Sequence, residues 1–157
     1  MQSFIEDIYL KHEYDLDMFG FEVDSCNDTI NDFYVYAWYI KSNPKKYFYV
    51  GKGKKDRYKH ILWDINVLKK NPKKYKGKPY KLLQDNFEIE YEFLYKELTE
   101  KEAIILEAYS IMKYLKNKEP LLNVILPCAI MQDEELMKYR DGYYYEKNEE
   151  KFLEYYK

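Results

Sequence analysis

Two strand-like runs around a turn constrain the fold of this chain more than any other feature of its sequence. Residues 33–40 read FYVYAWYI and residues 47–50 read YFYV, and such β-branched and aromatic runs are typical of strands. The KSNPKK segment between them contains an Asn-Pro turn signal. The sequence therefore predicts an antiparallel β-hairpin.

The register of this hairpin would bring two tyrosines together. We expect Ile40 to pair with Tyr47, and that register sets Trp38 opposite Tyr49. Tyr36 is then the diagonal neighbour of Tyr49 on the same face of the sheet. Ordinary aromatic packing across strands would also explain this pair, so it points to chemistry only in combination with other residues.

After the hairpin, a helix is predicted along the basic part of the chain. Gly51 and Gly53 are expected to break the second strand. The helix should run from residue 54 or 55 to about residue 70, because apolar side chains recur there at helical spacing. Asn71 and Pro72 end the pattern.

One more strand and further helices complete the expected fold. A short helix around residues 80–84 should precede a third strand at residues 88–95, whose alternation indicates one buried face. Thr99 and Glu102 form a capping box that opens a helix to residue 115 or 116. This order predicts an α+β fold with a small three-stranded, mostly antiparallel sheet flanked by helices.

The length of the chain allows one domain with extensions at both ends. Its 157 residues suffice for one compact core but not for two ordinary domains. We expect an acidic extension at residues 1–32, a central domain at residues 33–126 and a C-terminal extension at residues 127–157. The last part should form one more helix packed on the same domain.

The cysteines and the hydropathy of the chain indicate a cytoplasmic protein. Cys26 and Cys128 lie far apart and outside any CxxC pair, which fits a reducing compartment and no structural zinc. The N-terminus lacks the features of a signal peptide, and no apolar run reaches the roughly 18 residues of a membrane span.

Charge is strongly segregated along the chain, although the net charge is only -2. Residues 41–81 hold fifteen Lys and Arg against two acidic residues, whereas residues 1–40 and 82–157 have net charges of -8 and -7. A basic block with interleaved aromatics is typical of proteins that bind nucleic acid. The alternative is a lysine-rich face that is simply solvated. The interleaved aromatics are Tyr47, Phe48, Tyr49, Tyr58, Trp63, Tyr75 and Tyr80.

Three polar residues are candidates for phosphate chemistry. Arg57 and His60 lie three residues apart on the predicted helix and so point to a similar side, and arginine offers always-charged donors to a phosphate. Glu107 is the only charged residue in the run AIILEAYSIM at residues 103–112, so its carboxylate should be partly buried. A divalent metal would offset the cost of that burial. Alternatively, Glu107 could lie at the edge of the core and pair with a lysine of the basic block, and His60 could be an ordinary packing residue.

Four segments in order resemble the GIY-YIG nuclease superfamily. The stretch VYAWYIKSNPKKYFYVGKGKKDRYKHI resembles its defining segment, in the branch that has FYVGKG in place of YIG. LTEKEAIILEAYSIM resembles the helix with the metal-binding glutamate, and PLLN resembles the asparagine motif that follows it. The resemblance covers residues 34 to about 125.

The resemblance implies a site whose residues are distributed over this whole segment. The implied catalytic residues are Tyr36, Tyr49, Arg57, His60 and Glu107, with Glu107 as the metal ligand. The residues implied to contact substrate are Gly51, Lys52, Lys54, Lys55 and Asn123, of which Asn123 could instead be structural. Two departures stand out. Tyr34 occupies the place of the motif's glycine, and His60 follows Arg57 by three residues where the family commonly has four. Tyr58 is therefore the alternative to His60.

The activity implied by the resemblance is hydrolysis of phosphodiester bonds by an endonuclease with one Mg²⁺ or Mn²⁺ ion. Tyr36 would help to deprotonate the attacking water, Tyr49 would orient the water or the phosphate, and Arg57 would neutralise growing charge. The expected partner is nucleic acid, DNA rather than RNA, and no membrane. The competing classes are an inactive nucleic-acid-binding protein on the same fold and a protein-interaction module. The acidic N-terminal segment could shield the basic surface or mediate a homodimer.

Overall fold

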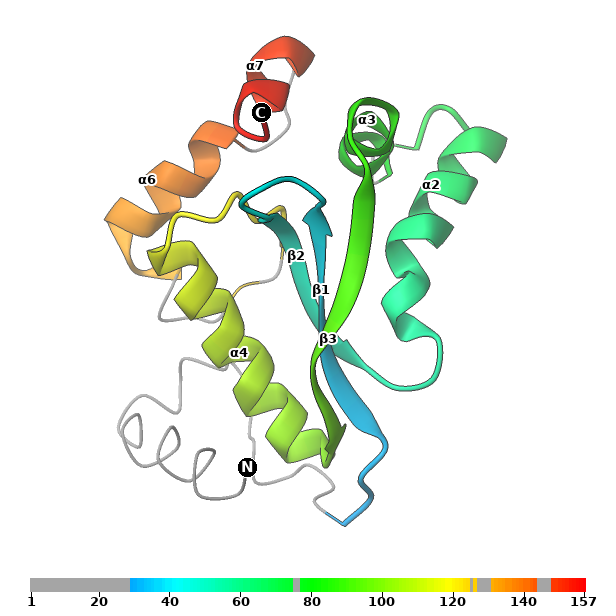
Figure 1. The fold of residues 1–157 in the computed structure, drawn as a ribbon, viewed down its shortest axis with the longest axis vertical. Coiled ribbons are helices and arrows are strands. Elements are labelled where there is room, and N and C mark those ends of the chain that lie inside the picture. The colour runs from blue at the N-terminus through cyan, green and yellow to red at the C-terminus, as the bar shows by residue number, and fades with distance from the viewer. Residues whose placement is uncertain (1–28, 75–76, 125, 127–130, 144–147) are drawn as a thin grey trace.

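A three-stranded antiparallel sheet with helices on both faces forms the centre of the protein, a small α+β fold (Figure 1). The computed structural model describes residues 29–74, 77–124, 126, 131–143 and 148–157, so nearly all of the predicted acidic extension lies outside the described residues. The elements in chain order are β1 (Phe33–Ile40), β2 (Lys46–Gly53), the 3₁₀ turn η3 (Arg57–Lys59), α2 (His60–Lys70), α3 (Lys78–Asn86), β3 (Ile89–Leu98), α4 (Glu100–Lys116), α6 (Glu134–Tyr143) and α7 (Glu149–Glu154).

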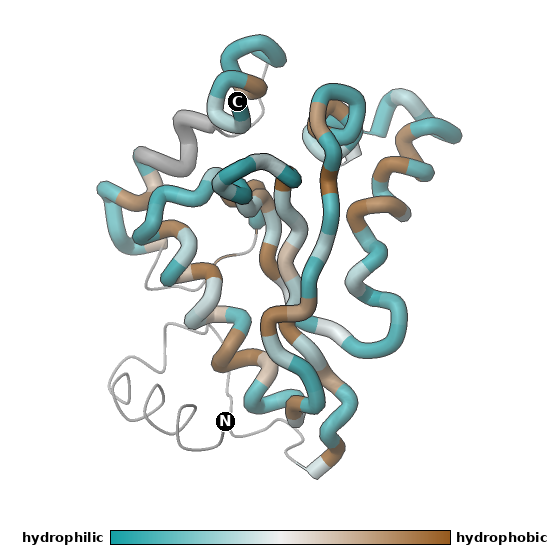
Figure 2. Tube along the Cα trace, viewed as in Figure 1, coloured by the Kyte–Doolittle hydropathy of each residue, from teal (hydrophilic) through white to brown (hydrophobic). Residues whose placement is uncertain are grey.

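The first strand, β1, is the middle strand of the sheet and is covered on both faces. Val35 and Ala37 belong to the core cluster formed with α4. The even-numbered residues belong to the cluster on the opposite face, formed with α2 and α3; they are Tyr34, Tyr36, Trp38 and Ile40. Burial on both sides explains why the run FYVYAWYI contains no charged residue. Hydrophobic segments lie along the strands in the interior, and hydrophilic stretches dominate the loops (Figure 2).

The predicted hairpin register is right in the middle of the strands and wrong at the turn. Trp38 lies opposite Tyr49, as predicted. Ile40, however, pairs with Lys46 and not with Tyr47. A β-bulge beside Trp38 adds one residue to β2 and shifts the register beyond it, and a single extra residue of this kind leaves no periodic signal in the sequence.

The helix after the hairpin begins later than predicted. β2 continues through Gly51 to Gly53, so these two glycines lie within the strand and do not break it. After a turn, η3 begins at Arg57 and α2 at His60. α2 ends at Lys70, where the prediction placed its end.

A tyrosine of β1 fixes the turn that delays this helix. The Tyr34 hydroxyl donates to the carbonyl of Lys55 at 2.9 Å and accepts from the backbone N–H of Tyr58 at 3.0 Å. Lys55 has a φ of 53°, in the left-handed region, so it cannot be part of a right-handed helix. The start of the helix is therefore set by contacts with a distant strand, which helical spacing cannot reveal.

The third strand, β3, is longer and less buried than predicted. It pairs with β1 and continues to Leu98, beyond the predicted end at residue 95. Leu98 is its only fully buried residue. As an edge strand, β3 is partly covered on both faces instead of having the single buried face that its alternation indicated.

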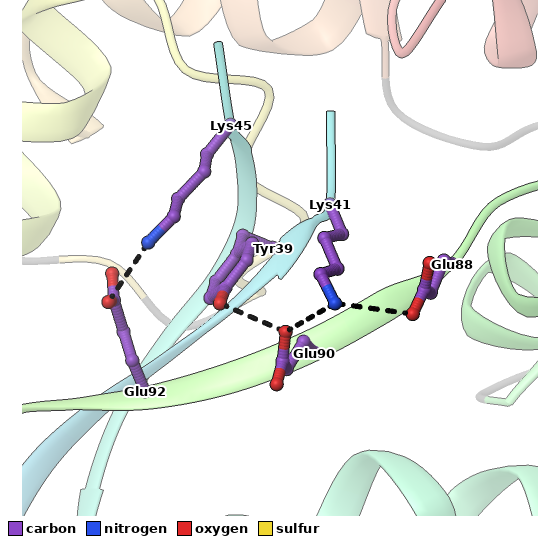
Figure 3. Close-up of polar contacts among 6 residues, drawn as sticks. All are labelled: Tyr39, Lys41, Lys45, Glu88, Glu90 and Glu92. Atoms are coloured by element: carbon purple, nitrogen blue, oxygen red, sulfur yellow. Dashed lines mark hydrogen bonds and ion pairs between the residues drawn. The ribbon is translucent and has the colours of Figure 1, made fainter. Parts of the chain in front are cut away.

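Glutamates at β3 form ion pairs with lysines of the hairpin (Figure 3). Lys41 lies 3.5 Å from Glu88 and 3.8 Å from Glu90, and Lys45 lies 3.3 Å from Glu92. Exposed pairs of this kind add little stability each. They do show that Lys41 and Lys45, two lysines of the basic block, have acidic partners within the same chain.

The helix α4 begins with the predicted capping box and crosses one face of the sheet (Figure 1). The Thr99 hydroxyl accepts from the Glu102 N–H at 3.1 Å, and the Glu102 carboxylate accepts from the Thr99 N–H at 2.9 Å. Each bond satisfies a backbone donor that the first helical turn would otherwise leave without a partner.

The C-terminal segment contains two described helices, α6 and α7, where one was predicted. Phe152 and Tyr156 are buried in the cluster on the α2 side of the sheet, and the Tyr156 hydroxyl donates to the carbonyl of Pro120 at 2.6 Å. The end of the chain thus packs against the sheet domain. Within the described ranges, no helix has the length and apolar character needed to cross a membrane.

Removing the capping box should destabilise the protein without changing its site. Thr99→Ala deletes a buried acceptor at the helix start, and we expect the free energy of unfolding to fall by about 1 kcal/mol in urea denaturation. Lys113→Ala, an exposed change in the same helix, is the control and should alter it by less than about 0.5 kcal/mol. Equal effects of the two changes would contradict a role for the cap.

Candidate active site

A cavity of about 390 Å³ opens beside β2, and its walls come from segments spread over most of the described chain. Its lining consists of Tyr36, Tyr49, Val50, Lys52, Arg57, His60, Tyr80, Glu107, Ile111, Asn123 and Val124. These residues belong to β1, β2, η3, the helices α2, α3 and α4, and the segment after α4. The structure thus brings seven of the residues named from the sequence to one cavity: Tyr36, Tyr49, Lys52, Arg57, His60, Glu107 and Asn123.

Two glycines of β2 make room for the side chains of this cavity. Gly51 lies opposite Tyr36, and a Cβ atom there would approach the Tyr36 hydroxyl to 2.7 Å and the Tyr49 ring to 2.8 Å. At Gly53 a Cβ would come within 2.5 Å of the Arg57 Cβ and Cγ. Both distances are shorter than atoms tolerate. Gly51 is buried and is not among the residues that line the cavity, and these distances support a role in spacing the two phenols.

Tyr36 and His60 form the buried centre of the site. Their exposed fractions are 1% and 4%, and the Tyr36 hydroxyl lies 2.8 Å from His60 Nδ1 in a hydrogen bond. The Tyr49 ring packs 4.5 Å from the His60 ring and 6.1 Å from the Tyr36 ring, measured between centroids. One imidazole is therefore in contact with both phenols.

Both phenols are neutral in this environment. Burial raises the pKa of Tyr36 far above its ordinary value, the neighbouring Tyr49 raises it further, and Arg57 opposes the shift. Burial, together with the charge of Glu107, raises the pKa of Tyr49 to about 12. An ionised phenol would need nearby positive charge to lower its pKa. The groups of the protein itself leave the neutral form dominant, because the loss of hydration exceeds the attraction of Arg57.

The tight turn η3 explains how His60 reaches the site three residues after Arg57. A 3₁₀ turn has three residues per turn, so residues i and i+3 lie on the same side. Ile61, at the spacing of four, is fully buried in the core. Tyr58, the alternative to His60, does not line the cavity. Its ring packs 4.6 Å from the ring of Tyr91.

Glu107 is the only carboxylate among the cavity-lining residues. It projects from α4, half-buried, and burial raises its pKa above the ordinary value, while the charge and the backbone N–H of Lys52 counteract that shift. In the described part of the chain, no group of three or more His, Cys, Asp or Glu could hold a metal ion. A single carboxylate whose ionised form is penalised by burial nevertheless fits Mg²⁺. This ion keeps several waters and takes its other ligands from substrate phosphates.

Asn123 fixes the segment after α4 against β2. Its side-chain oxygen accepts from the Val50 N–H at 3.1 Å, and its amide donates to the Val50 carbonyl at 2.6 Å. Leu122 adds a backbone bond of 2.7 Å to the Phe48 carbonyl. Of the two roles left open for Asn123, these bonds support the structural one.

Lys54 and Lys55 lie outside the cavity lining. Both are exposed, and the Lys54 ammonium sits 5.5 Å from the centre of the Phe33 ring. Tyr80 is a lining residue that sequence reasoning did not place in the site, with its ring 6.4 Å from those of Tyr49 and His60. The only available signal was its position in the aromatic and basic block. For the other lining residues, Val50, Ile111 and Val124, the sequence contained no such signal.

Comparison with known proteins identifies no relative: no family model, no curated protein and no solved structure matches this chain.

Replacing Asn123 should reduce stability more than its small size suggests. Asn123→Ala leaves both backbone groups of Val50 without their side-chain partner in a buried place, which costs about 1–3 kcal/mol in the free energy of unfolding. Asn117→Ala, at an exposed helix end, is the matched control and should change it by less than about 0.5 kcal/mol. An Asn123 variant with unchanged stability would contradict the structural role.

Proposed function

We propose that this protein is a metal-dependent endonuclease that hydrolyses phosphodiester bonds in nucleic acid, DNA rather than RNA. The observation that carries the proposal is the convergence of two tyrosines, an arginine, a histidine and a lone carboxylate on one cavity. The order of the motifs along the chain, which resembles the GIY-YIG nucleases, supports the same reading. Combining a cation, a carboxylate and proton-transfer groups in this way suits chemistry on a phosphate.

Arg57 and Lys52 would hold the phosphate in the cavity. The planar Arg57 guanidinium can donate two parallel hydrogen bonds to phosphate oxygens. Lys52 adds a second positive charge on the same wall and lies near enough to Glu107 to lower its pKa. Charge that grows on the phosphate during attack would be stabilised by these fixed donors.

Glu107 would hold a divalent cation such as Mg²⁺ or Mn²⁺. The chemistry that such an ion supplies when bound is neutralisation of negative charge on the phosphate and on the leaving oxygen. The protein's own contribution is a carboxylate whose ionised form is disfavoured by burial and is therefore stabilised by a nearby positive charge.

Tyr36 and His60 would together accept the proton of the attacking water. Tyr36 and His60 Nδ1 share a hydrogen bond. In the tautomer with the proton on Nε2, the neutral Tyr36 hydroxyl would donate to Nδ1, and its oxygen could accept a hydrogen bond from water. As the water oxygen bonds to phosphorus and the bond from phosphorus to the leaving oxygen breaks, the water proton passes to Tyr36 while the Tyr36 proton passes to His60. The leaving oxygen takes up a proton from solvent. No free phenolate forms, which agrees with the raised pKa of Tyr36. Tyr49, against the same imidazole, would orient the water or the phosphate.

Glu107→Gln tests the function through cleavage and through thermal stability. Supercoiled DNA, linear DNA and RNA are incubated with Mg²⁺ or Mn²⁺, and we expect DNA cleavage by the unaltered protein and none by the variant. In the folded protein, burial raises the pKa of Glu107, so stability falls as pH rises from the unfolded to the folded pKa. Above that window, and without added metal, the variant should melt at a higher temperature than the unaltered protein.

Added metal separates the enzyme from its alternatives. Mg²⁺ or Mn²⁺ should raise the melting temperature of the unaltered protein and leave that of Glu107→Gln unchanged, because only the ionised carboxylate binds the ion. Binding of nucleic acid without cleavage under any condition would favour an inactive binding protein. Cleavage that survives Glu107→Gln would refute the proposed site.

A double-variant cycle tests the proton transfer through Tyr36 and His60. Tyr36→Phe and His60→Gln should each lower kcat by about 10²–10⁴-fold. The loss of kcat in the double variant should be no larger than the loss in the less active of the two single variants, because the two groups act as one unit. Tyr58→Phe, outside the cavity, is the control and should retain full activity. Independent, multiplicative losses would contradict the coupled transfer.

A further inference from the structure

The described lysines of the basic block differ in whether an acidic side chain pairs with them. At the hairpin, Lys41 and Lys45 form ion pairs with glutamates at β3 (Figure 3). On and just after α2, the described residues provide no ion pair for a second group, which consists of Lys59, Lys69, Lys70, Lys73 and Lys74. Among the described residues, lysines without an ion pair thus lie along α2 and its following loop, as well as at Lys54 and Lys55 in the turn before it.

This helix, α2, also exposes apolar side chains to solvent. Ile61 and Ile65 face the core and are buried. On the opposite side, Trp63 and Val67 have 43% and 48% of their surfaces exposed, one helical turn apart. Figure 1 places α2 at the outer edge of the molecule, on the far side of the sheet from α4.

The outer side of α2 has exposed apolar residues in its middle and a lysine at each end: the half-buried Lys59 in η3, just before the helix, and the exposed Lys70 at its last residue. Lys59 comes one turn before Trp63, and Lys70 comes three residues after Val67, so helical spacing puts them on one side. Asn66, between the two apolar residues, is exposed as well. We call this set the α2 stripe: Lys59, Trp63, Asn66, Val67 and Lys70.

The α2 stripe begins at the candidate active site. His60 is the first residue of α2, Arg57 lies in the turn before it, and both line the cavity. With a rise of about 1.5 Å per residue, the stripe extends about 15 Å away from that end. A polymer held along the stripe would therefore pass next to the cavity.

We propose that the α2 stripe docks double-stranded DNA by lying in its major groove. This inference rests on the proposed function, because it names the substrate class that the same cavity would cut. The major groove admits an α-helix, lysines at either end can reach the flanking phosphates, and apolar side chains can contact thymine methyl groups. The α2 stripe offers both kinds of contact, because exposed Trp63 and Val67 lie between lysines that have no ion pair among the described residues.

Two other occupants fit the α2 stripe less well. Single-stranded nucleic acid is bound by several aromatic side chains that stack on successive bases, and the stripe holds one aromatic residue. A second copy of this chain, related by a two-fold axis, would bring the same lysines face to face, and like charges disfavour such contact. Duplex DNA fits on both counts, because its phosphates carry the opposite charge and its major groove is wide enough for an α-helix.

Binding measurements on the full chain test this docking. In the Glu107→Gln background, which prevents cleavage, fluorescence anisotropy gives Kd for a labelled duplex and for either of its single strands. Trp63→Ser with Val67→Ser should weaken duplex binding by about tenfold and leave single-strand binding unchanged. Met131→Ser, which removes another exposed apolar side chain outside the basic block, should change neither Kd. Thermal melts verify that the variants are folded.

The salt dependence of duplex binding tests the lysines separately. Lys59→Gln with Lys70→Gln should reduce the slope of log K against log salt by about one for each lysine. Lys113→Gln with Lys116→Gln removes the same charge from α4 and should leave the slope unchanged. Equal slopes for both double variants would overturn the contact between the stripe and phosphates.

The remaining outcomes separate the docking from the nuclease activity. Unchanged duplex affinity in Trp63→Ser with Val67→Ser, or an equal loss on single strands, overturns duplex docking. A dimer in solution that this variant abolishes also overturns it, in favour of self-association. DNA cleavage that the stripe changes do not affect refutes the docking and leaves the proposed nuclease. Duplex binding that depends on the stripe, with no cleavage by the unaltered protein, refutes the nuclease and leaves the docking.

Discussion

A tyrosine hydroxyl buried in a strand that is covered on both faces is the constraint on which the rest of the structure depends. Such a group is costly unless it has a hydrogen-bond partner, and His60 supplies one to Tyr36 at 2.8 Å. Gly51 leaves the space in which the two side chains meet. This bond links the central strand to the first residue of α2, while the Tyr34 hydroxyl of the same strand fixes the turn that precedes the helix and contains Arg57.

The same interior sets the electrostatics of the candidate active site. Burial keeps both phenols neutral and penalises the ionised form of Glu107, while Arg57 and Lys52 provide positive charge at the cavity. The arrangement costs stability, because burial penalises the ionised Glu107 carboxylate and Lys52 offsets only part of that penalty. It is well suited to a ligand that brings the missing charges with it. A phosphate and a divalent ion have those charges, which is why the proposed function accounts for the site better than structural packing alone.

The lysines of the basic block differ in the acidic side chains that lie near them in the folded protein. Along the sequence it is one region, but among the described residues glutamates at β3 pair with the hairpin residues Lys41 and Lys45, whereas the lysines of α2 have no ion pair. Positive charge therefore gathers on the side of the sheet that carries His60 and Arg57. Composition could not distinguish these two groups of lysines, because the acidic residues that separate them come from a strand more than forty residues further along the chain.

The sequence by itself determined the elements whose signals are local. The aromatic runs of β1 and β2, the capping box of Thr99 and the lone charge of Glu107 in an apolar helix could each be recognised from nearest neighbours. Only the tertiary structure decided the bulge beside Trp38 and the delayed helix start held by Tyr34. It also decided that His60 and Tyr80 line the cavity and that Tyr58 does not. Each of these depends on contacts between residues far apart in the chain, and such contacts leave no periodic pattern in the sequence.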